Sequence, residues 1–355
     1  MTRTIGIRRE DKSEWERRTP VAPPEVEALT QQGVTFCVQP SEKRVFPQKD
    51  FEEAGAQVAS DLEGCSLVLG VKEIPLELLR PKTTYLYFSH TIKGQSYNMP
   101  ALKRLMELGC DLIDYEKVED EEGRRLIFFG RHAGLAGMID SLWALGERLE
   151  AHEGIKSPFQ ELSPAHGYES LEAAKKAVQA VGEKIKKEGL PAVLSPLVCG
   201  FAGYGNVSGG AQEIFDLLGG LEVSPEELLD EDAPLDPGSI YKVVFKENHL
   251  VEPVDAGDSF ELQEYYDYPE RYRGVFSRYL PHLSVLMNCV YWEERYPRLV
   301  TREALMALMD RGPLGLKVIG DISCDVAGGV EATVKATQPD DPVFVYDPRS
   351  AEIEM

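Results

Sequence analysis

The sequence predicts an α/β protein with parallel sheets in two domains, and three observations support this class. Short apolar runs alternate with amphipathic helical patterns along the chain, as when helices join parallel strands. One apolar run, 197–198, leads into a glycine-rich turn and then a helix, an arrangement that typically holds a dinucleotide. The length of 355 residues exceeds an ordinary single core. We therefore expect two Rossmann-like domains.

Titratable groups follow the expected strands of the first third of the chain. These strands lie at residues 5–7, 34–38, 67–71, 84–88 and 111–116. Lys72, His90 and Glu116 stand at the ends of three of them, and a charged loop, 8–18, follows the first. Because parallel strands end at one edge of a sheet, where α/β proteins bind ligands, we predict that these groups face one cleft.

The glycine-rich turn lies between a strand and a helix in the second half of the chain. Gly203 permits a tight turn, and Gly205 lets the backbone approach a pyrophosphate. Ser208 stands where a third glycine is usual, and it is small enough for the helix and strand to pack closely. Two helices precede this turn: a long one that begins at Gly130, with apolar spacing from Leu135 to Leu149, and one at 171–187.

The next expected strand, 221–224, ends at the position that usually contacts the adenosine ribose. NAD sites carry Asp or Glu there, whereas this chain has Ser224, which suits a 2′-phosphate better than a carboxylate does. The nearest cation is Lys242, and the intervening segment is acidic. The residues alone leave NAD and NADP open. Further strands are expected at 283–288 and 316–323.

Composition excludes several classes of partner. The formal net charge of -22 argues against nucleic acid and anionic membranes. No apolar run reaches the ~18 residues that span a bilayer, and the first residues lack a signal-peptide pattern. Six dispersed cysteines without a CxxC pair indicate reduced thiols and no metal site. We expect a cytoplasmic protein.

Several motifs together resemble a known family. They lie at residues 8–11, 15–18, 72–73, 88–93, 113–117, 203–208, 291–293, 297–299 and 321–329. They resemble the alanine dehydrogenase, transhydrogenase and saccharopine dehydrogenase superfamily. Within it, the chain looks like the lysine-2-oxoglutarate reductase domain of aminoadipic semialdehyde synthases.

This resemblance implies both an architecture and a reaction. Residues 1–132 and 322–355 would form a substrate domain, residues 133–321 a dinucleotide-binding Rossmann domain, and the active site would lie in the cleft between them. The implied reaction is the NADPH-dependent reductive condensation of L-lysine with 2-oxoglutarate to saccharopine. The cofactor would be NADP(H), with NAD(H) not excluded.

The resemblance, the strand ends and the arginine-rich loop together predict the site residues. The catalytic acid/base pair is Lys72 and His90; the substrate-binding residues are Arg9, Arg18, Glu116, Arg125 and Asp321; the cofactor-binding residues are Gly203, Gly205, Asn206, Val207, Ser224 and Asn288. The chemistry agrees with this assignment. Imine formation needs a base for the lysine ε-amine and an acid for the departing hydroxyl. The three substrate carboxylates call for arginines.

Other interpretations stay open at this stage. The family carries a further segment after the motif that ends at Gly329, whereas here only residues 330–355 follow. The sequence is then a shortened one, or a separate polypeptide completes it, or activity has been lost. An amino-acid dehydrogenase of the alanine dehydrogenase type and a non-catalytic dinucleotide-binding subunit are the alternatives. The protein is also a candidate homo-oligomer.

Overall fold

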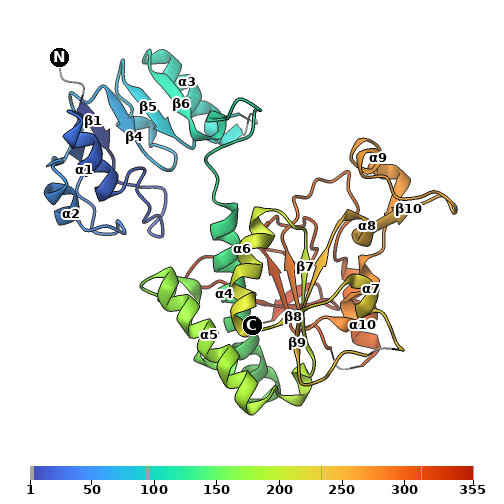
Figure 1. The fold of residues 1–355 in the computed structure, drawn as a ribbon. Coiled ribbons are helices and arrows are strands. Elements are labelled where there is room, and N and C mark those ends of the chain that lie inside the picture. The colour runs from blue at the N-terminus through green and yellow to red at the C-terminus, as the bar shows by residue number, and fades with distance from the viewer. Residues whose placement is uncertain (1–3, 93, 95, 233, 313, 355) are drawn as a thin grey trace. The chain divides into compact units, whose positions relative to one another are not determined.

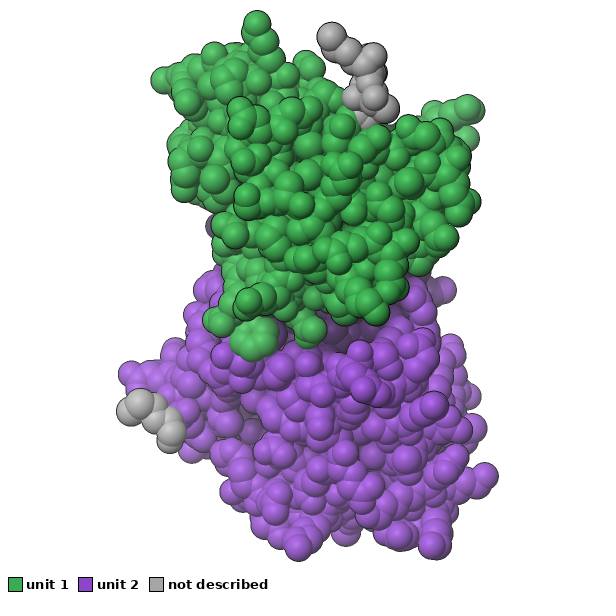
Figure 2. Space-filling view, turned by 90° about the vertical axis from the view of Figure 1, so that its left-hand side faces the viewer, with its two compact units in different colours: residues 1–128 green, residues 129–355 purple. Residues whose placement is uncertain are grey.

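A computed structural model describes residues 4–92, 94, 96–232, 234–312 and 314–354 (Figure 1). The chain divides into two compact units, residues 1–128 and 129–355, which Figure 2 distinguishes by colour. Each unit has its own parallel sheet and its own buried core. The predicted α/β class is confirmed.

Unit 1 contains a six-stranded sheet in the order β3-β2-β1-β4-β5-β6. All neighbouring strands run parallel, with Ile7 opposite both Val38 and Leu69. The strands are β1 (Thr4–Ile7), β2 (Thr35–Val38), β3 (Gln57–Val58), β4 (Leu67–Leu69), β5 (Thr84–Tyr87) and β6 (Asp111–Asp114). The five strands expected from the sequence are present, and the short edge strand β3 is an addition.

Helices α1 (Pro23–Gln31), α2 (Gln48–Glu53) and α3 (Met99–Glu107) complete unit 1. Val26 of α1 and Phe51 of α2 are buried in a cluster with Ile7 and Phe36 of the sheet. Leu105 of α3 is buried in a second cluster with Tyr85 and other residues of the sheet. These cores fix the strands whose ends carry the predicted site.

Unit 2 contains a five-stranded parallel sheet in the order β13-β12-β7-β9-β8. The strands are β7 (Leu197–Ala202), β8 (Leu221–Glu222), β9 (Ile240–Phe245), β12 (Val285–Asn288) and β13 (Val318–Asp321). Every residue of the central strand β7 is buried, which explains its continuous apolar run. The sequence analysis omits β9, which lies between β7 and β8.

Helices α4 (Gly130–Glu153), α5 (Leu171–Glu188) and α6 (Asn206–Phe215) share one buried cluster with the sheet of unit 2 (Figure 1). Glycines allow α4 and α6 to approach closely. A Cβ atom on Gly134 would lie 1.9 Å from the carbonyl oxygen of Val207, and one on Gly210 would lie 2.0 Å from that of Arg131. These glycines therefore let α4 pack closely against the helix that follows the glycine turn.

The remaining elements of unit 2 include two small antiparallel pairs, β10–β11 and β14–β15. The remaining helices and strands of this unit are α7 (Pro225–Leu228), α8 (Glu247–Leu250), β10 (Val251–Pro253), α9 (Leu262–Asp267), β11 (Tyr272–Gly274), α10 (Arg302–Asp310), β14 (Val345–Asp347) and β15 (Glu352–Glu354). Short 3-10 helices lie at Leu76–Leu78, Ser96–Asn98, Tyr115–Lys117, Pro158–Glu161, Ala165–Gly167, Ala192–Leu194, Asp216–Leu218, Pro269–Arg271, Phe276–Arg278 and Leu280–His282.

The chain after β13 groups with unit 2, whereas the sequence analysis assigns residues 322–355 to the substrate domain. The backbone N–H of Leu299 donates to the carbonyl of Gly329 at 2.8 Å. The Arg302 guanidinium donates to the carbonyl of Arg349 at 2.6 Å. The functional role of this segment stays a prediction. Among the described residues, no helix is both long and apolar enough to cross a membrane.

Candidate functional site

Four neighbouring strands of unit 1 end at the same edge of the sheet. They are β1, β4, β5 and β6, and all run parallel. Lys72 follows β4, His90 follows β5 and Glu116 follows β6, while the loop 8–18 follows β1. The structure thus places the predicted catalytic pair and most predicted substrate-binding residues at one edge, as expected from parallel strands.

His90 forms a hydrogen-bonded pair with Glu73, a residue to which the sequence analysis gives no role. Nδ1 of His90 lies 2.9 Å from Oε1 of Glu73, and the Asn98 amide donates to the same oxygen at 3.4 Å. Burial alone would raise the pKa of Glu73. The hydrogen bond from His90 and the charges of His90 and Lys12 outweigh burial and lower that pKa to about 2. An ionised carboxylate only accepts, so Nδ1 carries the proton and Nε2 is left for chemistry.

His90 also has an unusual backbone conformation, with φ of 50°. Histidine adopts this left-handed region more readily than most residues with a side chain. The imidazole stacks near Phe88, with ring centroids 6.3 Å apart and planes 16° apart. The strand end, the aromatic ring and the Glu73 carboxylate together fix the orientation of the imidazole.

The backbone of Lys72 is held by Glu10, a buried residue of the loop after β1. The two carboxylate oxygens of Glu10 accept from the backbone N–H groups of Val71 at 2.8 Å and Lys72 at 3.0 Å. Burial raises the pKa of Glu10 above its usual range, despite these bonds and the nearby Arg8. Among the described residues, the Lys72 ammonium has no hydrogen-bond acceptor. Its amine is therefore available to a substrate.

The Arg18 guanidinium donates two hydrogen bonds to the Glu16 carboxylate, from Nε at 2.8 Å and from Nη2 at 2.6 Å. The Glu16 side chain is only 8% exposed, whereas that of Arg18 is 42% exposed. Burial raises the pKa of Glu16, but the Arg18 contacts and the charge of Lys72 lower it on balance. In turn, the hydrogen bond to Glu16 raises the pKa of Arg18. Glu16 thus positions a half-exposed guanidinium near the Lys72 charge.

The other predicted substrate-binding residues of unit 1 are also accessible. Arg9 is exposed, and its guanidinium lies 3.4 Å from Asp11. Arg125 pairs with Glu116 at 3.2 Å and lies over the Phe88 ring at 5.4 Å. The backbone N–H of Glu116 donates to Asp114 at 2.8 Å, which holds the end of β6 in place. Arginines from two loops therefore flank the strand ends.

In unit 2, the predicted turn joins β7 to α6 and leaves room for a ligand. Gly203 has φ of 95°, a conformation that favours glycine. A Cβ atom on Gly205 would meet no atom of the described residues within 4 Å. No described side chain caps the first turn of α6, which begins at Asn206 and Val207, so its backbone N–H groups stay open to an anion. These residues fit the pyrophosphate of a dinucleotide.

Asn288 and Asp321 contact each other where β12 and β13 end. The Asn288 amide donates to Oδ1 of Asp321 at 2.8 Å, and the Ser323 hydroxyl donates to the same oxygen at 2.8 Å. Thr333 donates to the other oxygen at 2.5 Å. Asn288 is fully buried. This network lies at the carboxyl edge of the sheet, as does the glycine turn that follows β7.

Ser224 caps a helix and does not end the strand beside the glycine turn. Its hydroxyl accepts from the N–H of Glu227 at 3.1 Å, and Glu227 accepts from the Ser224 N–H at 2.7 Å. Lys242 pairs with Asp216 at 2.8 Å and Glu222 at 3.5 Å. The strand that neighbours β7 is β9. The residues just after β9 therefore stand at the end of the strand beside β7, and they were not predicted from the sequence as candidates for the ribose contact.

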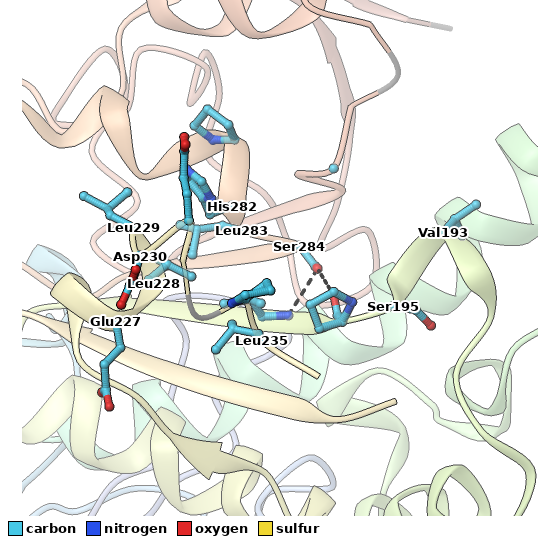
Figure 3. Close-up of a pocket in the computed structure, with 16 residues that line it drawn as sticks. Val193, Ser195, Glu227, Leu228, Leu229, Asp230, Leu235, His282, Leu283 and Ser284 are labelled. Carbon is cyan, nitrogen blue, oxygen red and sulfur yellow. Dashed lines mark hydrogen bonds between the residues drawn. The ribbon is translucent and has the colours of Figure 1, made fainter. Parts of the chain in front are cut away.

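A cavity of about 440 Å³ in unit 2 lies at the opposite edge of the sheet (Figure 3). Its lining includes Ser195, His282 and Ser284, which precede or begin β7 and β12. The Ser284 hydroxyl accepts from the N–H of Val198 at 3.2 Å. Open parallel sheets bind ligands at their carboxyl edges, which is where the glycine turn lies and this cavity does not.

Comparisons with known proteins show which families this chain resembles. Residues 6–136 match the family model of the alanine dehydrogenase/PNT N-terminal domain. The chain is 40% identical to an alpha-aminoadipic semialdehyde synthase of Arabidopsis thaliana over 97% of its own length. It is 26% identical to a saccharopine dehydrogenase [NAD(+), L-lysine-forming] of Neurospora crassa, over 98% of this chain and 78% of that protein.

A solved L-alanine dehydrogenase covers 92% of this chain and 76% of its own, at 17% identity and a TM-score of 0.52, and so shares the fold. The matched segment resembles the N-terminal domain of the alanine dehydrogenase/PNT family, and nearly the whole chain resembles alpha-aminoadipic semialdehyde synthases. The relatives that match nearly all of this chain are named alpha-aminoadipic semialdehyde synthase and saccharopine dehydrogenase. The chain spans about a third of the plant synthase, 34% of its length.

Proposed function

We propose that this chain makes saccharopine from L-lysine and 2-oxoglutarate by reductive condensation, with NADP(H) as its cofactor. The observation that carries the proposal is the cluster at one sheet edge of unit 1, where Lys72, the His90–Glu73 pair and several arginines gather. Relatives named aminoadipic semialdehyde synthase and saccharopine dehydrogenase support the same reaction.

Lys72 and His90 divide the proton transfers. The ε-amine of the substrate lysine must lose a proton before it attacks the keto carbon of 2-oxoglutarate, and water must leave to form the imine. Nε2 of His90 is suited to one transfer because Glu73 holds Nδ1. The Lys72 amine, whose backbone is fixed by Glu10, is suited to the other.

The arginines bind the substrate carboxylates. Lysine and 2-oxoglutarate carry three carboxylates between them, and a guanidinium matches a carboxylate with two parallel hydrogen bonds. Arg9, Arg18 and Arg125 are all at least partly exposed, and each comes from a loop at this edge. Glu116, paired with Arg125, would receive the α-ammonium of lysine.

Unit 2 holds the cofactor. The residues that bind its pyrophosphate are Gly203, Gly205, Asn206 and Val207, through the open backbone groups at the start of α6. Asn288 and Asp321 line the same edge of this sheet. When bound, the nicotinamide supplies the hydride that reduces the imine.

The decisive experiment follows NADPH oxidation with two substrate pairs. Lysine plus 2-oxoglutarate should consume NADPH and yield a product with the mass of saccharopine. Pyruvate plus ammonia should not. Turnover with the second pair alone would instead indicate an amino-acid dehydrogenase. Dinucleotide binding without turnover on either pair would indicate a non-catalytic subunit.

A further inference from the structure

The end of β9 stands beside the glycine turn of unit 2. Ala202, the last residue of β7, is opposite Phe245, the last residue of β9. The backbone N–H of Gly203 donates to the carbonyl of Phe245 at 2.9 Å. Lys246 and Glu247 follow Phe245 directly, so they lie next to the turn proposed to hold the pyrophosphate.

This place in a dinucleotide fold meets the adenosine ribose. A carboxylate at the end of the neighbouring strand binds the ribose 2′-hydroxyl of NAD, whereas a cation accommodates the 2′-phosphate of NADP. Lys246 and Glu247 offer both chemistries at adjacent positions. The contacts of each side chain decide which one is available to the ribose.

Two tyrosines engage the Glu247 carboxylate. The Tyr266 hydroxyl donates to its Oε1 at 2.7 Å, and the Tyr204 hydroxyl lies 3.4 Å from the same atom. Burial and the Glu247 carboxylate both raise the pKa of Tyr266, so its hydroxyl stays protonated and keeps donating. Tyr204 belongs to the glycine turn itself. Glu247 therefore ties the turn to the segment around α9.

Among the residues that the structure describes, Lys246 has no such anionic partner. Its ammonium lies 5.8 Å from the centroid of the Tyr204 ring, and no carboxylate of the described residues pairs with it. Lys242 lies four residues earlier in the chain and differs from Lys246, because two carboxylates already neutralise the charge of Lys242. The backbone N–H of Lys246 donates to Nδ1 of His249 at 2.9 Å, which fixes the chain at this point.

We propose that Lys246 binds the 2′-phosphate of NADP(H) and sets the preference for NADP(H) over NAD(H). The Tyr204 ring holds the Lys246 ammonium beside the glycine turn. The hydrogen bonds of Tyr266 and Tyr204 to Oε1 of Glu247 make this carboxylate less available to the ribose. This inference rests on the dinucleotide-binding function proposed for unit 2. It moves the ribose-reading position from Ser224 to the end of β9.

The test is calorimetric titration of the full chain with NADPH, NADH, 2′,5′-ADP and 5′-AMP. The wild type should bind NADPH and 2′,5′-ADP more tightly than NADH and 5′-AMP. Lys246→Ala should weaken NADPH and 2′,5′-ADP by about 10- to 100-fold, the range for a charge-assisted hydrogen bond. The affinity of Lys246→Ala for NADH and 5′-AMP should stay within about twofold of the wild-type affinity, because neither ligand carries a 2′-phosphate.

Lys242→Ala is the matched control, because it removes a lysine of β9, the strand that Lys246 follows, and the charge of Lys242 is already paired. It should leave the NADPH/NADH ratio unchanged, as should Ser224→Ala. Lys246→Arg should retain most of the preference. Thermal unfolding without ligand should be unaltered in Lys246→Ala, since the side chain is exposed.

Two results would overturn the inference while leaving the function intact: an equal loss for both dinucleotides, or no loss in Lys246→Ala. A wild type that prefers NADH would also overturn it. Failure of the wild type to bind either dinucleotide would instead refute the cofactor function of unit 2, and the inference with it.

Discussion

His90 Nδ1 lies 2.9 Å from Glu73 Oε1, which joins the end of β5 to the end of β4. The second oxygen of Glu73 is buried and has no hydrogen-bond partner among the described residues. Despite burial, the hydrogen bond from His90, a backbone hydrogen bond and the charges of His90 and Lys12 lower the pKa of this carboxyl, so it keeps its charge. The pair therefore orients the imidazole and also links folding stability to pH.

Glu73→Gln should change the acid stability of the protein. The folded pKa of Glu73 is about 2, below its ordinary value of 4.5. A depressed pKa adds stability that is present above pH 4.5 and is lost as pH falls toward 2. At neutral pH this linkage amounts to on the order of 3 kcal/mol. Urea unfolding at pH 6 and pH 3 should show a smaller acid-induced loss in Glu73→Gln than in the wild type. Parallel pH profiles would contradict the linkage.

Lys72→Met and His90→Gln should each lower kcat by on the order of 10²–10⁴, as expected for a positioned acid or base. Each variant should also lose one limb of the bell-shaped pH–rate profile. NADPH affinity should persist, because neither residue belongs to unit 2. His90→Asn serves as a control for backbone strain, since asparagine tolerates the positive φ of this position. A complete bell in either variant would remove that residue from the mechanism.

Arg18→Ala should raise KM for 2-oxoglutarate or lysine far more than it changes NADPH affinity. Loss of a charged pair costs roughly 2–5 kcal/mol when its partner stays buried. The variant also leaves the buried Glu16 carboxylate without its arginine partner, so the effect on folding must be separated from the effect on KM. Arg18→Ala combined with Glu16→Gln removes the stranded carboxylate and should restore stability but not KM. Arg17→Ala, whose guanidinium bonds the Lys43 carbonyl, is the matched control. Unchanged KM values in Arg18→Ala would leave Arg18 a structural partner of Glu16.

The strand ends of unit 1 could be predicted because their sequence signal is local. An apolar run followed by Lys72, or by His90, marks a buried strand and the group at its end. The parallel order of β1, β4, β5 and β6 then brings these groups to one edge. Glu73 was not predicted as a partner of His90, because their contact depends on the positive φ of His90 and on strand pairing. Neither the positive φ nor the strand pairing has a local pattern in the sequence.

The strand predicted from the sequence to neighbour the glycine turn is wrong. The prediction takes the segment that ends at Ser224 as the second strand, yet β9 separates that segment from β7. Lys242 interrupts the apolar pattern of β9, and its charge is compensated by Asp216, 26 residues earlier. Only the folded sheet reveals this compensation. The error matters for function because the proposed ribose-reading position moves from Ser224 to Lys246.

Gly205→Val should abolish dinucleotide binding and leave the fold intact. Gly205 has φ of -79°, which valine adopts without strain, and its Cβ would enter open space. In the proposed complex, that space holds the pyrophosphate, so the side chain would block it. NADPH affinity should fall by more than about 100-fold, or ~3 kcal/mol. Gly209→Ala, which also faces open space but lies inside α6, should keep affinity and stabilise the helix by up to ~1 kcal/mol. If Gly205→Val still bound NADPH in calorimetry as the wild type does, the phosphates would lie elsewhere and the assignment of α6 would fail.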